Sequence, residues 1–257
     1  MTIAQPKQCI DFVIVGAQKA GTSVLHAFLT QHPQISMPVK KEMHYFNRTS
    51  SLDFSLPLWR DRKRLLFHNA FPGFPEPSMI YGEATPHYMT WDVALDRIHT
   101  YNPNIRVVAV LRNPIARAFS HWNMEWQRGL VQTDFETAIK QELSTLQQTH
   151  EALDKVYSFV QRGLYAHQVE RLWRKFGRAN VHIIKHANLL HHHEKTLRDL
   201  HSFLGVSHHG TKAQKVHERS YHTGLREETR QALLRLYHKD IERIESMLGW
   251  DCSDWRE

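Results

Sequence analysis

The sequence predicts an α/β fold that is P-loop-like, with a mainly parallel central sheet flanked by helices on both faces. Short β-branched apolar runs, such as 12–15 and 105–111, are typical of parallel strands buried on both faces. These runs alternate with longer stretches whose apolar residues recur every three or four positions, as in helices. A glycine-containing turn follows the first run directly. We therefore expect strands and helices to alternate along a single domain covering residues 1–257.

Turn and cap residues set the expected order of the elements. The expected strands are 12–15, 79–83, 105–111 and 181–184, and the expected helices begin after residue 21, near 92 and at 114, and then cover 134–149, 157–176, 194–204 and the stretch around 233–248. Pro33 disfavours helix at the residue before it, Pro114 suits a first helical position, and Gly205 suits a C-cap. The three prolines of 71–77 prevent regular structure, so we expect a loop-rich insertion at about 48–79.

Composition and charge narrow the classes of function. The net charge of +7 fits an anionic ligand, but no dense Lys/Arg block with interleaved aromatic residues suggests nucleic-acid binding. No apolar run approaches the roughly 18 residues of a membrane span, and the first ten residues lack a signal-peptide core. Two cysteines far apart, Cys9 and Cys252, argue against a disulfide framework and suit a reducing compartment. We expect a cytoplasmic protein.

Residues 16–23, Gly-Ala-Gln-Lys-Ala-Gly-Thr-Ser, join the first strand to the first helix. Gly16 and Gly21 match the glycines of the phosphate-binding motif G-x-x-x-x-G-K-[ST], but the lysine stands earlier, at Lys19, and Thr22 occupies its usual place. The turn and the helix N-terminus direct several backbone N–H groups at one point. This pattern predicts a phosphate-like anion site, and the displaced lysine argues against an ordinary Mg²⁺-dependent triphosphatase. An incidental glycine-rich turn is the alternative.

A second basic-plus-hydroxyl pair, Arg112 and Ser120, follows the strand at 105–111. Ligands of open parallel sheets collect at the carboxyl ends of the strands. That rule gathers the loops after Val15, Glu83 and Leu111 around one crevice. Two such anion sites on one ligand indicate a nucleotide phosphorylated at two positions. The alternative for Arg112 is a surface arginine at a helix start.

Four segments share an order and spacing with one protein family: Ile14–Ser23, Lys41–Phe46, Gly82–Tyr88 and Arg106–Trp122. Together they resemble the sulfotransferases that use 3′-phosphoadenosine-5′-phosphosulfate (PAPS), especially the heparan-sulfate type and its bacterial relatives. A weaker resemblance to the same family begins at Arg162-Gly-Leu-Tyr165 and reaches the C-terminus. The resemblance implies in-line transfer of the PAPS sulfuryl group to a hydroxyl, or an amine, of a carbohydrate or small-metabolite acceptor.

The resemblance also implies roles for individual residues. It assigns the 5′ end of PAPS to Gln18, Lys19, Gly21, Thr22 and Ser23, and the 3′-phosphate to Arg112 and Ser120, with Arg219 as the candidate in the C-terminal cofactor loop. Glu42 matches the catalytic base, which takes the proton of the acceptor. His44 is a rival base, because strand-like alternation places residues 42 and 44 on one side. A sulfuryl group carries less charge than a phosphoryl group, so lysine and backbone donors suffice and no metal is expected.

Several alternatives stay open. Ala84 stands where heparan-type enzymes usually have a lysine, which weakens the case for heparan sulfate itself. The runner-up function is an ATP/Mg²⁺-dependent small-molecule kinase, and the third is a non-catalytic nucleotide-binding or nucleic-acid-binding module. Glu42 is otherwise a surface acid paired with Lys40 or Lys41. The run of histidines at 191–193 does not converge on a metal ion, so we expect a solvated loop there.

Overall fold

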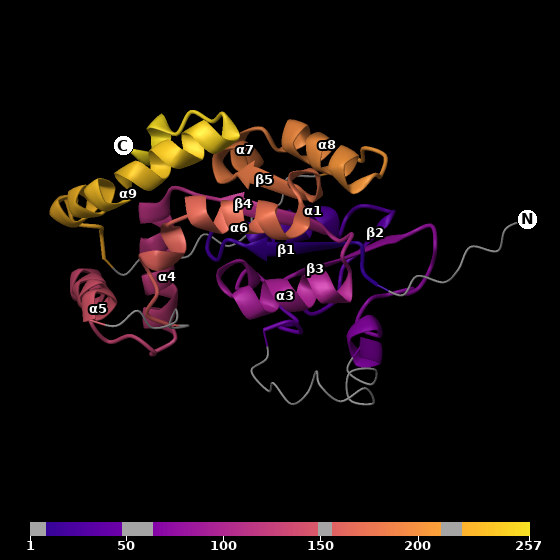
Figure 1. Cartoon of the computed structure of the whole chain (residues 1–257), viewed down its shortest axis with the longest axis horizontal. Coiled ribbons are helices and arrows are strands. Elements are labelled where there is room, and N and C mark those ends of the chain that lie inside the picture. Colours follow the sequence, from indigo (N-terminus) through magenta and orange to yellow (C-terminus); the bar gives the residue numbers. More distant parts are fainter. Residues whose placement is uncertain (1–8, 48–63, 149–155, 212–222) are drawn as a thin grey trace, which may run out of the picture. The chain divides into compact units, whose positions relative to one another are not determined.

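The computed structural model describes residues 9–47, 64–148, 156–211 and 223–257 (Figure 1). The chain divides into two compact units. We call the first, Met1–Ala17, Gly21–Val110 and Leu172–Val216, the sheet unit, and the second, Gln18–Ala20, Leu111–Arg171 and His217–Glu257, the helical unit. The expectation of a single domain over 1–257 stays a prediction.

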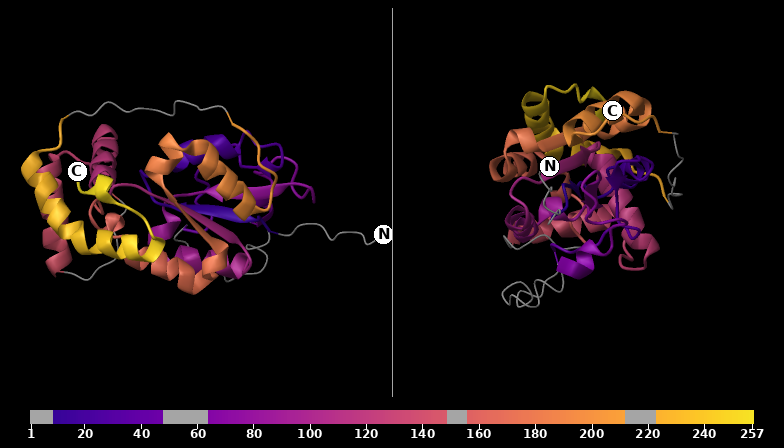
Figure 2. Two further views of the ribbon diagram at one scale, coloured as in Figure 1. Left: turned by 90° about the horizontal axis from the view of Figure 1, so that it is seen from above. Right: turned by 90° about the vertical axis from the view of Figure 1, so that its right-hand side faces the viewer.

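A five-stranded sheet forms the centre of the sheet unit. The strands are β1 Phe12–Gly16, β2 Ile35–Ser36, β3 Ile80–Ala84, β4 Arg106–Leu111 and β5 Val181–Lys185, in the order β2-β3-β1-β4-β5. β1 pairs in parallel with β3 and β4, and β2 pairs in parallel with β3. Every residue of β1 is buried, so both faces of the sheet are covered (Figures 1 and 2). The predicted α/β fold with a mainly parallel sheet is confirmed.

The position of β1 within the sheet decides where a ligand is expected. β3 and β4 flank β1 on opposite sides, so the strand order reverses at β1, and the carboxyl end of such a strand is the usual ligand site. Close packing fixes the register of β1 with β3, in which Phe12 faces Gly82. A Cβ at Gly82 would lie 2.0 Å from Cζ of Phe12, so this position requires glycine.

Helices and short 3₁₀ turns complete the sheet unit. They are α1 Thr22–Leu29, η2 Tyr88–Thr90, α3 Asp92–Tyr101, η4 Arg178–Asn180, α7 His186–His191 and α8 His193–Leu204. Gly205, with φ of 71°, is the C-cap of α8, as predicted. His191 and His192 are exposed, as expected for a solvated segment, but the expected loop is wrong, because His191 ends α7 and His193 begins α8. The Thr196 hydroxyl donates to the carbonyl of His192 at 3.0 Å and stabilises this tight join.

The helical unit contains α4 Pro114–Gln127, α5 Phe135–Gln148, η3 Gln161–Gly163, the first part of α6 Ala166–Phe176, α9 Glu227–Leu248 and η5 Ser253–Trp255. Asn113 caps α4, since its Oδ1 accepts from the N–H groups of Ile115 and Ala116, and Pro114 takes the first position as predicted. The core of this unit includes the buried side chains of Trp122, Phe135, Tyr237 and Trp255.

The helix expected over 157–176 begins only at Ala166. The carboxylate of Asp240, on α9, accepts from the N–H of Tyr165 at 2.7 Å and from that of Ala166 at 3.1 Å, and so caps α6. Just before it, Gly163 packs on Tyr237, where an added Cβ would lie 2.7 Å from the phenol oxygen. Both partners come from α9, far along the chain, so the local apolar spacing carries no sign of this boundary.

Part of the expected insertion at 48–79 lies outside the described residues, which resume at 64. Residues 64–68 are helical and 69–79 contain turns without a regular element, so the loop-rich expectation holds only for the latter. Phe67 anchors this helical turn in the core, since the residue is 2% exposed and its ring stacks on that of Tyr45 with centroids 4.2 Å apart. Cys9 and Cys252 are both free, as predicted. None of the helices in the described part of the chain is long and apolar enough to cross a bilayer.

Candidate functional site

The turn after β1 has the geometry of an anion cradle. Gly21 is the N-cap of α1 with φ of 95°, and it makes no side-chain cap to the helix. A Cβ at Gly21 would lie 2.6 Å from Cδ2 of His186, so both the backbone angle and the space require glycine. Thr22 is buried and Ser23 is exposed in the first turn of α1. The N-terminus of α1 has no side-chain cap, and a helix N-terminus of this kind suits an anion.

Two of the predicted cofactor residues, Lys19 and Arg112, are in contact within the helical unit. Arg112, directly after β4, donates from Nη1 to the backbone carbonyl of Lys19 at 3.2 Å. Lys19 itself has φ of 69°, a left-handed backbone angle. Ser120 lies two turns into α4 and is half-buried. The structure thus brings Lys19 and Arg112 together, as the sequence predicted for them.

Two residues for which we predicted no role bond to Gln18 and to Arg112. The Arg162 side chain, 1% exposed, donates from Nη1 to Oε1 of Gln18. The Tyr165 hydroxyl donates to the backbone carbonyl of Arg112 at 3.0 Å. Arg162 and Tyr165 are the ends of the Arg-Gly-Leu-Tyr segment that carries the weaker part of the family resemblance, and that segment was the only signal that pointed to them.

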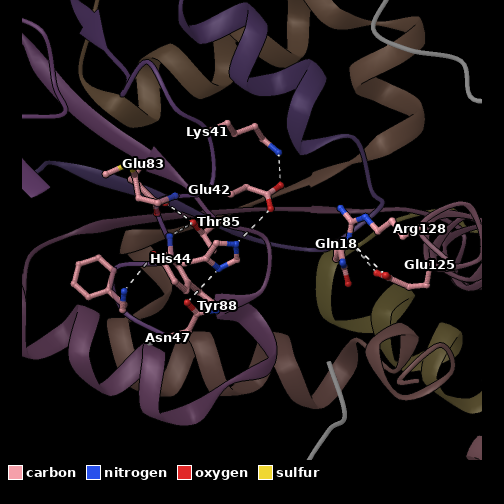
Figure 3. A network of polar contacts seen from close by, with 12 residues as sticks. Gln18, Lys41, Glu42, His44, Asn47, Glu83, Thr85, Tyr88, Glu125 and Arg128 are labelled. Carbon is pink, nitrogen blue, oxygen red and sulfur yellow. Dashed lines mark hydrogen bonds and ion pairs between the residues drawn. The ribbon is translucent and has the colours of Figure 1, made fainter. Parts of the chain in front are cut away.

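The two candidate bases lie beside each other in the sheet unit. Nε2 of His44 is 3.7 Å from Oε2 of Glu42, and the ammonium of Lys41 is 2.9 Å from Oε1 of Glu42 (Figure 3). The ion pair with Lys41, which the surface-acid alternative for Glu42 predicted, is therefore present. Burial alone raises the pKa of Glu42, but Lys41, His87 and His44 outweigh it and hold the pKa below its ordinary value. Glu42 is accordingly ionised at neutral pH, as a base must be.

The adjacency of Glu42 and His44 does not come from strand alternation. Both residues have positive φ angles, 63° and 53°, so the chain bends here and is not extended. His44 also places Nδ1 3.2 Å from Oδ1 of Asn47. The prediction that these side chains share one side holds, but its stated reason is wrong.

The remaining predicted residues divide as follows. Arg219 lies outside the described residues. Nδ1 of His208 lies 3.3 Å from Nδ1 of His201 in the sheet unit, and the His201 ring lies 4.6 Å from that of His32. Across residues 9–47, 64–148, 156–211 and 223–257, no group of three or more His, Cys, Asp or Glu side chains could hold a metal ion.

Comparison with known protein families decides the class. A family model described as "Sulfotransferase domain" matches residues 10–256. The chain belongs to the sulfotransferase family. This match does not support the kinase alternative.

The sulfotransferase resembles curated and solved proteins over different lengths. Heparan sulfate glucosamine 3-O-sulfotransferase 3B1 of Homo sapiens is 28% identical over 200 residues, which are 78% of this chain and 47% of that protein. Membrane-associated sulfotransferase kil1 of Dictyostelium discoideum is 29% identical over 136 residues, or 48% of this chain and 27% of that protein. The chain thus spans about half, or less, of the length of these relatives.

Solved sulfotransferases share the fold. The crystal structure of a sulfotransferase from Alicyclobacillus acidocaldarius superposes with a TM-score of 0.78 at 29% identity, covering 99% of this chain and 100% of that one. A mouse sulfotransferase complexed with PAP, the 3′,5′-bisphosphate product of PAPS, has a TM-score of 0.50 at 13% identity, covering 90% of this chain and 63% of that one. The second likeness concerns the fold alone.

Proposed function

We propose that this chain is a PAPS-dependent sulfotransferase that delivers a sulfuryl group to a hydroxyl, or less readily an amine. One observation carries the proposal: the Arg112 guanidinium bonds to the backbone of Lys19. This contact puts two cationic residues of the predicted cofactor site side by side. Paired cationic residues suit a nucleotide with anionic groups at both its 3′ and 5′ positions, and the family match supports the same ligand.

The residues present fit such a nucleotide. The cradle at Gly21 has no room for a side chain, and the start of α1 lacks a side-chain cap. We assign the 5′ end to Gln18, Lys19, Gly21, Thr22 and Ser23, and the 3′-phosphate to Arg112 and Ser120. Arg162 and Tyr165 hold Gln18 and Arg112 in position through the bonds described above.

Glu42 is the proposed base. PAPS supplies the activated sulfuryl group when it is bound. Glu42 is ionised, 37% exposed at its side chain and next to His44, so it can take a proton from an acceptor that reaches it from solvent. Lys19 contributes positive charge where the leaving oxygen becomes anionic. None of these roles needs a metal ion.

The acceptor is proposed to be a carbohydrate, because relatives of this chain are named heparan sulfate glucosamine 3-O-sulfotransferases. Ala84 is buried at the position where heparan-type enzymes usually carry lysine. The proposal therefore names carbohydrates as a class and does not single out heparan sulfate. A small-metabolite acceptor is the second choice. A cytoplasmic location remains part of the proposal and rests on the two free cysteines.

A transfer assay tests the proposed activity. The full chain is incubated in EDTA with sulfur-labelled PAPS and a panel of glycans, phenols and amino sugars. We expect label on at least one carbohydrate class, with one PAP formed for each group transferred. Lys19→Ala should lose rate and cofactor affinity, whereas Lys195→Ala, an exposed lysine paired with Asp199, should match the wild type.

Two outcomes contradict this activity. Transfer of γ-phosphate from labelled ATP in the presence of Mg²⁺, without any transfer from PAPS, would favour the alternative function of a small-molecule kinase. A chain that binds PAP yet labels no acceptor would be a non-catalytic nucleotide-binding module.

A further inference from the structure

The segment that carries the candidate bases has an unusual backbone. Glu42 and His44 adopt φ angles of 63° and 53°, in the left-handed region that residues with a Cβ seldom occupy. Such angles cost free energy and persist only where the surroundings hold them. Neither residue is glycine or asparagine, the types that tolerate the region best. The interactions that stabilise these backbone angles must therefore come from outside the segment.

These interactions come from the end of β3 and from Thr85, the residue that follows it (Figure 3). Three consecutive N–H groups donate to it: that of Glu42 to the carbonyl of Ala84 at 3.1 Å, that of Met43 to Oε1 of Glu83 at 3.1 Å, and that of His44 to Oγ1 of Thr85 at 3.3 Å. Two of the three acceptors are side chains. The bend thus depends on which residues occupy positions 83 and 85, and not on strand pairing alone.

Glu83 is the centre of this arrangement. Its side chain is completely buried, and the single oxygen Oε1 accepts from both the Met43 N–H and the Thr85 hydroxyl. The Thr85 hydroxyl in turn accepts from the N–H of His44. One carboxyl oxygen therefore orients Met43 directly and His44 through Thr85.

We propose that Glu83 is a positioning residue, whose buried Oε1 fixes the bend at 42–44 and so directs the Glu42 carboxylate and the His44 imidazole at one acceptor position. The 3.7 Å separation of Nε2 and Oε2 is the result of that bend. The consequence for catalysis rests on the proposed function, in which Glu42 or His44 receives the proton. The effect on the backbone does not.

The protonation of Glu83 fits this role. Burial raises the pKa of Glu83 to about 7, and the nearby Glu42 carboxylate acts in the same direction. A neutral carboxylic acid still offers one oxygen as an acceptor for both donors. Glutamine offers the same acceptor oxygen in nearly the same shape, so Glu83→Gln should preserve the bend.

Four variants separate positioning from general stability. Glu83→Leu removes the acceptor, and Glu83→Gln keeps it. Thr85→Val removes the second acceptor with little change of shape, and it decides the question if Glu83→Leu does not fold. The matched control is Thr90→Val, because Thr90 is also a buried threonine, 9% exposed against 0% for Thr85, and its hydroxyl donates to the carbonyl of His87, within its own turn.

Two measurements apply to each full-length variant. Amide hydrogen exchange at Met43 and His44 should accelerate at least about tenfold in Glu83→Leu and Thr85→Val, and stay unchanged in Glu83→Gln and Thr90→Val. The turnover number in sulfuryl transfer should fall about 30-fold or more in the first two variants, while the dissociation constant for PAP stays within about threefold. Glutamine should restore turnover to near wild type.

Each contrary result overturns a defined part of the proposal. Unchanged exchange in Glu83→Leu would show that the bend does not need Glu83, and unchanged exchange in Thr85→Val would show that Glu83 does not orient His44 through Thr85. A Glu83→Gln variant as damaged as Glu83→Leu would exclude the acceptor oxygen as the cause. Faster amide exchange in Glu83→Leu and Thr85→Val together with full turnover would show that the bend does not matter for catalysis. A wild type with no sulfuryl transfer would instead refute the proposed function, and the exchange results would still decide the positioning role.

Discussion

Two side chains compete to be the base, and their surroundings treat them differently. Glu42 is held ionised by the Lys41 ammonium and the two histidines near it, so it can accept a proton at neutral pH. The same positive charge makes it a weaker base, since basicity falls with pKa. His44 faces Asn47 through Nδ1, which leaves Nε2 directed at the Glu42 side. We assign the base to Glu42 because its charge state is suited to the role without any further change.

Replacement of Glu42 tests that choice. Glu42→Gln keeps the size of the side chain but removes the proton acceptor, so turnover should fall about 100-fold or more, as expected for a lost general base. The dissociation constant for PAP should stay within about twofold. His44→Ala should lower turnover by a smaller factor. Glu228→Gln, at an exposed residue at the start of α9, should leave turnover unchanged. Near-full activity in Glu42→Gln would transfer the role to His44.

Among the elements, α6 and α9 are joined by a cap that links stability to the proposed cofactor site. Asp240 on α9 accepts the N–H groups of Tyr165 and Ala166, and thereby fixes where α6 begins. Tyr165 then donates to the backbone carbonyl of Arg112. Loss of the cap should therefore affect both the free energy of unfolding and the position of Arg112.

A pair of cap deletions separates these two effects. Asp240→Ala should lower the free energy of unfolding by about 1–2 kcal/mol, the usual cost of a lost N-cap, and weaken PAP binding about tenfold. Asp134→Ala removes the cap of α5, where Asp134 accepts from the N–H of Thr137 at 2.8 Å, in the same unit. It should cost similar stability in urea denaturation but leave PAP affinity within about twofold. Equal PAP affinity in the two variants would contradict the link.

Elements whose signals are local could be predicted from the sequence. The apolar runs predicted β1 and β4, Pro114 predicted the start of α4, and Gly205 predicted the end of α8. The start of α6 could not be found, because its cap comes from α9. The bend at 42–44 could not be found either, because its cause is a set of acceptors at 83–85 that only the folded chain brings near. The proximity of Lys19 and Arg112 was predicted from the strand-end rule, while the contacts of Arg162 with Gln18 and of Tyr165 with Arg112 were not.

At the scale of the whole molecule, the predicted groups belong to two units. The helical unit contributes Gln18, Lys19, Arg112 and Ser120, and the sheet unit contributes Gly21, Thr22, Ser23, Glu42 and His44. The cofactor loop itself gives residues to both units, as the chain passes from one to the other at residues 18 and 21. The gathering of the loops after β1, β3 and β4 at one crevice stays a prediction.

The most direct test of the central claim compares two nucleotides that differ by one phosphate. Calorimetry on the full chain in EDTA should give PAP at least about 30-fold higher affinity than 5′-AMP, the equivalent of a charge-assisted contact of roughly 2 kcal/mol to the 3′-phosphate. Arg112→Ala should abolish that preference, and Arg235→Ala, an exposed arginine on α9, should preserve it. Equal affinity of the wild type for PAP and 5′-AMP would contradict the account.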